Sequence, residues 1–218
     1  MNLRDTVLEQ AEAAMQLSTE LGSTLLLAWS TAHQGWALGA LGQHERGISQ
    51  LREGLAICQA VCAESWVPYY LALLAETQAK AGQITEGLNT VAEALEMSNR
   101  RGDRWYEAEL HRLKGMLMLQ SKVPGPQSQV EGEAEECFWK AIEIARHQQA
   151  KSLELRAVMS LVRLRQQQAT PYATRNTQHE TRSRLAEAHQ MLSEIYNWFS
   201  EGFDTKDLQE AKALLATL

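Results

Sequence analysis

Residue types that could carry out catalysis are present, but none stands in a pattern that defines a catalytic site. His44-Glu45 begins like the His-Glu-x-x-His motif of zinc proteases, yet Ile48 occupies the place of the second histidine. The sequence has neither a glycine-rich phosphate-binding loop nor a Gly-x-Ser-x-Gly nucleophile turn. The six histidines are scattered without metal-ligand spacing. We therefore expect a protein that is not an enzyme and needs no cofactor or metal.

Thiols and clustered charges suggest other chemistry. Cys58 and Cys62 lie four residues apart in an apolar helical pattern, and Cys137 is remote. Buried thiols in a reducing cytoplasm explain this set better than disulfides or a metal pair without further ligands. The acidic run at 131–136 is typical of a helix start, where negative charge is favourable. Segment 151–184 carries seven basic and two acidic residues, so it is either a solvated face or a surface for an acidic partner.

The composition indicates a helical protein with a sizeable core. Of 218 residues, 44% are hydrophobic and 22% charged, which excludes a disordered chain. The 29 alanines and only 4 prolines favour helix throughout. A net charge of -6 argues against a nucleic-acid partner. Neither a signal peptide nor a long apolar run appears, so we expect a cytoplasmic chain without a membrane partner.

The elements that must position any site repeat along the chain. Segment 42–48 matches segment 82–88 at an offset of 40 residues, and Trp66 matches Trp105 at an offset of 39. Each repeat has two helices. A small residue lies near the middle of the first helix, at Gly35, Ala75, Gly115 and Ser160. The second helix carries a small-large-small pattern, at Gly47/Leu51/Gly54, Gly87/Val91/Ala94, Ala134/Phe138/Ala141 and, more loosely, Ala188/Leu192/Ile195. These spacings place small residues on one helix face, where they allow close packing of helix on helix.

This pattern predicts one row of helix pairs. We expect helices at about 3–20, 24–41, 44–62, 66–81, 84–99, 103–121, 130–148, 151–168, 181–199 and 205–217. The corresponding organisation is a single domain over 1–218. Its parts are a half repeat at 1–21, pairs at 22–63, 64–101, 102–149 and 150–200, and a C-terminal capping helix at 204–218.

The small-residue pattern resembles the tetratricopeptide repeat. Gly47, Gly87 and Ala134 take its alanine position, and Leu51, Val91 and Phe138 take its aromatic one. The period is near 40 rather than 34 and the terminal proline is absent, so HEAT-like pairs are the alternative. The resemblance implies an all-α, tetratricopeptide-like α-solenoid of antiparallel helix pairs, with about ten helices in a right-handed superhelix.

Longer strings, at 35–38, 104–110, 151–157 and above all 198–208, resemble a narrower group. They are similar to the C-terminal repeat region of large bacterial signalling proteins that join a class III adenylate or guanylate cyclase domain to a signalling ATPase. The resemblance implies a regulatory or scaffolding segment of a larger protein. The chain also opens in mid-repeat on an apolar helix with Leu3 and Val7. We therefore expect its N-terminal surface to meet an upstream domain or a second copy.

In such stacks the first helix of each pair lines a concave groove, and its positions give the candidate site. They are Trp29, Trp36, Tyr69, Glu76, Lys80, Glu109, Arg112, Met116, Glu154 and Arg165. Aromatic residues beside fixed charges are suited to gripping a protein or peptide. We therefore expect a non-catalytic protein-interaction module. The alternative is a peptide- or small-ligand-sensing domain, which a closed apolar pocket around Trp29, Trp36 and Tyr69 would favour. Trp29 and Trp36 could equally pack as core against helix 3–20.

Overall fold

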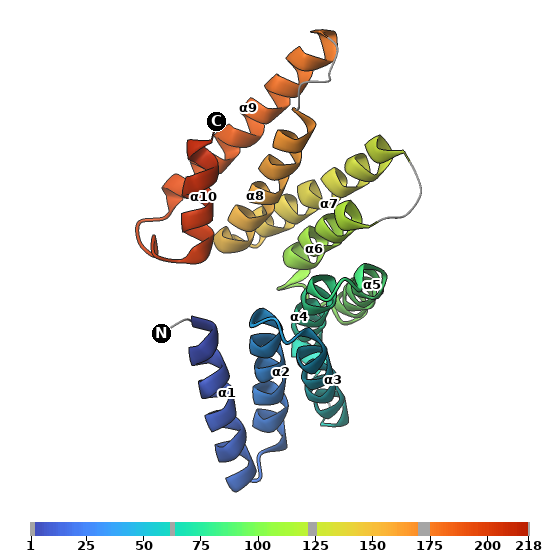
Figure 1. Cartoon of the computed structure of the whole chain (residues 1–218), viewed down its shortest axis with the longest axis vertical. Coiled ribbons are helices and arrows are strands. Elements are labelled where there is room, and N and C mark those ends of the chain that lie inside the picture. The colour runs from blue at the N-terminus through green and yellow to red at the C-terminus, as the bar shows by residue number, and fades with distance from the viewer. Residues whose placement is uncertain (1–2, 62–63, 122–125, 170–174, 218) are drawn as a thin grey trace. The chain divides into compact units, whose positions relative to one another are not determined.

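The chain has an all-α, solenoid-like fold in a computed structural model that describes residues 3–61, 64–121, 126–169 and 175–217 (Figure 1). Ten α-helices and one short 3-10 helix, η1 (Glu64–Trp66), occupy these ranges, which contain no strand. The helices are α1 (Leu3–Glu20), α2 (Thr24–Ala40), α3 (His44–Ala60), α4 (Val67–Lys80), α5 (Ile84–Arg101), α6 (Glu107–Gln120), α7 (Gln127–His147), α8 (Lys151–Gln168), α9 (Arg175–Trp198) and α10 (Lys206–Ala216).

Internal contacts divide the chain into two compact units. Unit 1 comprises Met1–Tyr106, and unit 2 comprises Glu107–Leu218. In unit 1, α1 packs on α2, α2 on α3, α3 on α4, and α4 on α5. In unit 2, α6 packs on α7, α7 on α8 and α8 on α9, while α10 packs on both α8 and α9. Whether the repeats form the single domain outlined above stays a prediction.

Glycines allow the helices of a pair to touch backbone to backbone. A Cβ atom added to Gly35 would lie 2.7 Å from the backbone nitrogen of Leu51, and one added to Gly54 would lie 2.8 Å from that of Ala32. In unit 2, a Cβ on Gly115 would lie 2.7 Å from Cε1 of Phe138. Side chains at these glycines would force the helices apart, because packed cores leave little free space. The expectation that small residues mark the contact between paired helices is confirmed.

The turns inside the first two complete pairs are alike. Gly42 follows α2 with φ +87°, and Gly82 follows α4 with φ +80°, a left-handed conformation that glycine adopts without strain. The two positions are 40 residues apart, the period read from the sequence. Two helices begin earlier than expected: α7 at Gln127 rather than near 130, and α9 at Arg175 rather than near 181.

Each unit has its own apolar core. In unit 1, Leu51, Val67, Val91 and Ala94 are fully buried, and the Cys58 thiol is buried with them, which raises its pKa. In unit 2, the residues that are fully buried or nearly so come from α6 to α10: Leu110, Leu117, Phe138, Leu155, Leu161, Leu192 and Ala211. Cys62 lies outside the described residues. In the part of the chain that the structure describes, no helix is long and apolar enough to cross a membrane.

Candidate interaction surface

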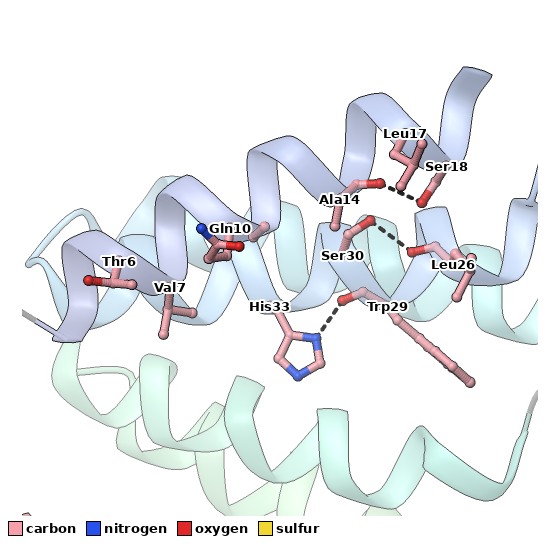
Figure 2. A pocket seen from close by; sticks show the side chains of 11 residues that line it. Thr6, Val7, Gln10, Ala14, Leu17, Ser18, Leu26, Trp29, Ser30 and His33 are labelled. Atoms are coloured by element: carbon pink, nitrogen blue, oxygen red, sulfur yellow. Dashed lines mark hydrogen bonds between the residues drawn. The ribbon is translucent and has the colours of Figure 1, made fainter. Parts of the chain in front are cut away.

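A groove between α1 and α2 is a concave feature of unit 1 (Figure 2). Its volume is about 450 Å³. One wall is a stripe of α1 at helical spacing: Thr6, Val7, Gln10, Ala11, Ala14, Leu17 and Ser18. The other is formed by Leu26, Trp29, Ser30 and His33 of α2. We call these eleven residues the α1–α2 groove. Spacings of three and four bring each stripe onto one helix face, so α1 and α2 present their stripes to the same hollow.

Three polar side chains in the α1–α2 groove, Ser18, Ser30 and His33, bond to their own helices, as the dashed lines in Figure 2 show. Ser18 donates to the carbonyl of Ala14 at 2.6 Å, and Ser30 donates to the carbonyl of Leu26 at 2.8 Å. Nδ1 of His33 lies 2.7 Å from the carbonyl oxygen of Trp29 and therefore carries the proton. The exposed surface of the groove is consequently almost wholly apolar.

A group of contacting rings adjoins the groove at Trp29. The ring centroid of Trp29 is 5.8 Å from that of Trp66, and Trp66 is 5.2 Å from Trp105. Tyr69 lies 5.8 Å from Trp105 and 5.1 Å from Tyr106. We call these five residues the aromatic cluster; its tilted and edge-on contacts are the arrangements that aromatic pairs prefer. Because the rings touch one another, they leave no gap for a cation and form a platform rather than a cage.

The aromatic cluster is partly open to solvent. Trp66 is 46% exposed and Trp105 is 43% exposed, whereas Tyr69 and Tyr106 are half-buried. The indole nitrogen of Trp105 donates to the carbonyl of Ser65 at 3.4 Å. The indole nitrogen of Trp29 is buried without a hydrogen-bond partner among the described residues. Exposed tryptophans supported by a rigid stack of rings are typical of surfaces that bind proteins.

The sequence-derived site residues of unit 1 fall in different places. Trp29 belongs to both the groove and the aromatic cluster, and Tyr69 belongs to the cluster. Trp36 is half-buried and does not line the groove. Lys80 and Glu76 form an exposed ion pair of 2.9 Å along α4. Of Trp29, Trp36 and Tyr69, the three residues expected around a closed apolar pocket, the groove includes only Trp29.

The site residues expected in unit 2 are largely internal, which departs from the concave-groove interpretation. Arg112 donates to both carboxylate oxygens of Glu109, at 2.9 and 2.7 Å, and both residues are buried. Arg156 adds a second cation to Glu109 at 2.9 Å. Met116 is half-buried, and its sulfur lies 2.9 Å from Nη1 of Arg112. These side chains hold unit 2 together instead of facing solvent.

Two further buried carboxylates, Glu154 and Glu135, also pair with two cations each. Glu154 accepts from Arg146 at 2.7 Å and from Lys151 at 2.8 Å. Burial opposes ionisation of Glu154, but these two hydrogen-bonded cations outweigh it and lower its pKa.

The third carboxylate is Glu135, which pairs with Arg165 and, at 3.0 Å, with Arg184. Burial, with the nearby charge of Arg184, lowers the pKa of Arg165 to about 10. A periodic sequence pattern could not reveal these pairs, because their members come from different helices.

The basic segment 151–184 is explained by the same contacts. Lys151, Arg156, Arg163, Arg165 and Arg184 each pair with a glutamate of unit 2. The acidic run 131–136 contributes Glu135 to this network, and Glu131 accepts from Gln168 at 3.1 Å. Within the described residues, no three acidic, histidine or cysteine side chains are grouped so that they could hold a metal ion.

Comparisons with known proteins agree with the fold. No protein-family model matches the sequence. A protein of Rhizobium meliloti (strain 1021), named only as uncharacterized, is 29% identical over 139 residues, which cover 64% of this chain and 12% of that protein. The chain thus spans about one eighth of that relative's length. Among solved structures, BtubC (BKLC) from P. vanneervenii has a TM-score of 0.73 at 16% identity, covering 100% of this chain and 83% of BtubC. At this identity the likeness shows the fold alone.

Proposed function

We propose that the chain is a non-catalytic protein-interaction module that binds a protein partner through unit 1. The observation that carries the proposal is the continuity of the aromatic cluster with the α1–α2 groove through Trp29. Two half-exposed tryptophans and an open apolar groove form one surface of the kind that monomeric proteins rarely leave without a partner. Charged anchors in unit 2 do not contribute, because they are buried in internal ion pairs.

We further propose that the module is a regulatory segment of a larger bacterial signalling protein in the cytoplasm. The similarity to one eighth of a much longer bacterial protein supports this view. So does the resemblance of strings such as 198–208 to the repeat region that follows cyclase and ATPase domains. The partner is then either another domain of the parent protein or a separate protein. The assignment of the helix pairs to the tetratricopeptide family belongs to the same proposal.

Affinity capture from the source cell tests the function. The bait is the intact chain, and the variant is Trp66→Ala together with Trp105→Ala. Trp198→Ala is the matched control, because Trp198 is an exposed tryptophan of unit 2 with 61% exposure. We expect the wild type and the control to retain the same partner and the double variant to lose it. Equal capture by all three proteins, with unchanged circular dichroism, would contradict a binding role for this surface.

A ligand-sensing role is the second candidate, favoured by the size of the groove. Its volume of about 450 Å³ lies in the range of about 300–1,000 Å³ that is usual for small-molecule sites. A thermal-shift screen with uncharged aromatic and aliphatic compounds tests it. Stabilisation that disappears in Leu17→Ser together with Leu26→Ser would support this role, and no stabilisation by any compound would exclude it in favour of a protein partner.

A further inference from the structure

Exposed leucines surround the α1–α2 groove. Leu17 and Leu26 face the groove and are 54% and 44% exposed. Leu21, in the turn that joins the two helices, is 66% exposed. Large aliphatic side chains in water carry a free-energy cost that burial against a partner removes. The rim of the groove is therefore as apolar as its floor.

The scarcity of exposed polar surface in the groove decides which backbone conformation fits, since the indole N–H of Trp29, which has no partner among the described residues, is itself buried. Ser18 and Ser30 donate to carbonyls of their own helices, and His33 donates through Nδ1 to Trp29. An extended peptide would bring backbone N–H and C=O groups into the groove and leave them without partners, which is costly. An α-helix satisfies its own backbone groups and brings only side chains. The groove thus favours a helical occupant.

The charged residues beside the groove indicate which charge a partner helix should carry. Helix α2 contains no Asp, Glu, Lys or Arg. At 100° per residue, Glu9 and Glu20 of α1 lie on the outer flank of the groove-lining stripe. Both are exposed, and in the described part of the chain neither forms an ion pair. A second copy of the chain would bring the same carboxylates against these, whereas a helix with basic flanks would complement them.

We propose that the α1–α2 groove binds a short amphipathic helix whose apolar face is flanked by Lys or Arg residues. The inference rests on the proposed function and names the class of partner. The lining stripe of α1 runs from Thr6 to Ser18, which corresponds to about 18 Å of helix. About three turns of a partner helix match that length, with apolar side chains at spacings of three and four filling the hollow between α1 and α2.

Synthetic peptides on the intact chain test the proposal. The probe is an amidated peptide of about 14 residues with Leu at helical spacing and Lys on both flanks. A second peptide replaces every Lys by Glu, and a third carries Pro at its centre. By calorimetry at low salt, we expect the Lys peptide to bind at least about tenfold more tightly than the Glu peptide. The Pro peptide should not bind, because proline breaks its helix. Equal affinity of the Lys and Glu peptides, or binding of the Pro peptide, would overturn the proposal.

Variants locate the peptide. The double variant Glu9→Lys, Glu20→Lys should bind the Lys peptide more weakly and the Glu peptide more tightly than the wild type does. A folding defect cannot reverse the preference in this way. The double variant Leu17→Ser, Leu26→Ser should lower the affinity for the Lys peptide by about tenfold or more. Leu25→Ser is the matched control, because Leu25 is 36% exposed but does not line the groove. Unchanged affinity in both double variants would refute the site, and so would dimerisation of the free chain that the leucine variant abolishes.

The two proposals can fail separately. If the chain captures its cellular partner through Trp66 and Trp105 but binds no Lys peptide, the helix-docking proposal is wrong and the interaction function stands. If the Lys peptide binds at the groove but no partner depends on this surface, the interaction function is wrong and the groove specificity stands.

Discussion

Unit 1 and unit 2 share one building plan but use their polar residues differently. Among the described residues of unit 1, the ion pairs are exposed or nearly so, as in Lys80 with Glu76 at 43% and 30% side-chain exposure. In the described part of unit 2, three of the four buried carboxylates, Glu109, Glu135 and Glu154, each take two cations, and the fourth, Glu107, lies 3.9 Å from His111. Unit 2 uses its charges for its own cohesion, whereas unit 1 leaves rings and an apolar groove open to solvent.

In an array of helix pairs, one part can therefore use its polar residues for internal stability while another part keeps a surface open for binding. Buried ion pairs add little net stability over apolar packing but are costly to break, so those of Glu109, Glu135 and Glu154 oppose rearrangement of α6 to α9. Close glycine contacts bring α2 and α3 together without charges, which leaves the surface of unit 1 free to diversify. Four predictions test this division, from the largest expected effect to the smallest.

Breaking one buried network should affect unit 2 most strongly. Glu109→Gln keeps the side-chain shape but leaves the buried guanidinium of Arg112 without its carboxylate, whereas Arg156 still has Asp207 at 3.7 Å. We expect a loss of about 3–5 kcal/mol in the free energy of unfolding, since an unpaired buried charge is expensive. Hydrogen exchange should rise first in residues 107–217. Glu143→Gln, in an exposed pair with Lys140, should change stability by about 0.5 kcal/mol at most. Equal effects of the two substitutions would show that the buried network stabilises unit 2 no more than an exposed ion pair does.

Filling a glycine contact should affect unit 1. A Cβ at Gly35 would meet backbone atoms of α3 at 2.7 and 2.8 Å, which cannot move without shifting the helix. We expect Gly35→Ala to destabilise the protein by about 1–3 kcal/mol in a guanidinium titration. Gly132 has open space around its Cβ position, so Gly132→Ala should instead stabilise α7 by about 0.5–1 kcal/mol. The same sign for both substitutions would show that helix propensity, not close packing, governs these sites.

Most of the helices could be predicted from the sequence. The periodic small residues and the glycine turns placed α2, α3 and α8 to within two residues, because local patterns specify these features. The start of α9 was misplaced by about six residues, since polar residues near Arg175 read as a loop although they form helix.

The site could be predicted only in part. Trp29 and Tyr69 were found from their register, while Glu109, Arg112 and Arg165 were expected in an open groove and are buried. Their partners, such as Arg156 and Glu135, come from other helices, and one sequence gives no sign of that pairing. Trp66 and Trp105 were visible only as equivalent repeat positions, and the sequence did not predict that their rings meet edge-on with centroids 5.2 Å apart. The α1–α2 groove was not predicted, because α1 had been interpreted only as a half repeat whose surface meets an upstream domain or a second copy.

Acid should distinguish the two units by a smaller margin. The pKa of Glu154 is lowered because its cations outweigh burial, and the pKa of Glu210 is lowered in the same way by Arg163. Their stabilising contribution is therefore full above the unfolded value of 4.5 and is lost as the pH falls below it through the folded pKa.

We accordingly expect amide hydrogen exchange to rise more steeply in unit 2 than in unit 1 as the pH is lowered from 5 to 3. In Glu154→Gln, this difference between the two units should be smaller. Parallel profiles in the two units would contradict this assignment.

Removing one ring of the aromatic cluster should have the smallest effect on stability. Trp66 contacts Trp29, Tyr69 and Trp105, but almost half of its surface is already exposed. We expect Trp66→Ala to cost about 1 kcal/mol and to reduce the near-ultraviolet circular dichroism, because coupled rings dominate that signal. Trp198→Ala should cost less, since Trp198 contacts only Phe199 among the described rings. If Trp66→Ala cost several kcal/mol, the cluster would be part of the core of unit 1 rather than a surface kept open for a partner.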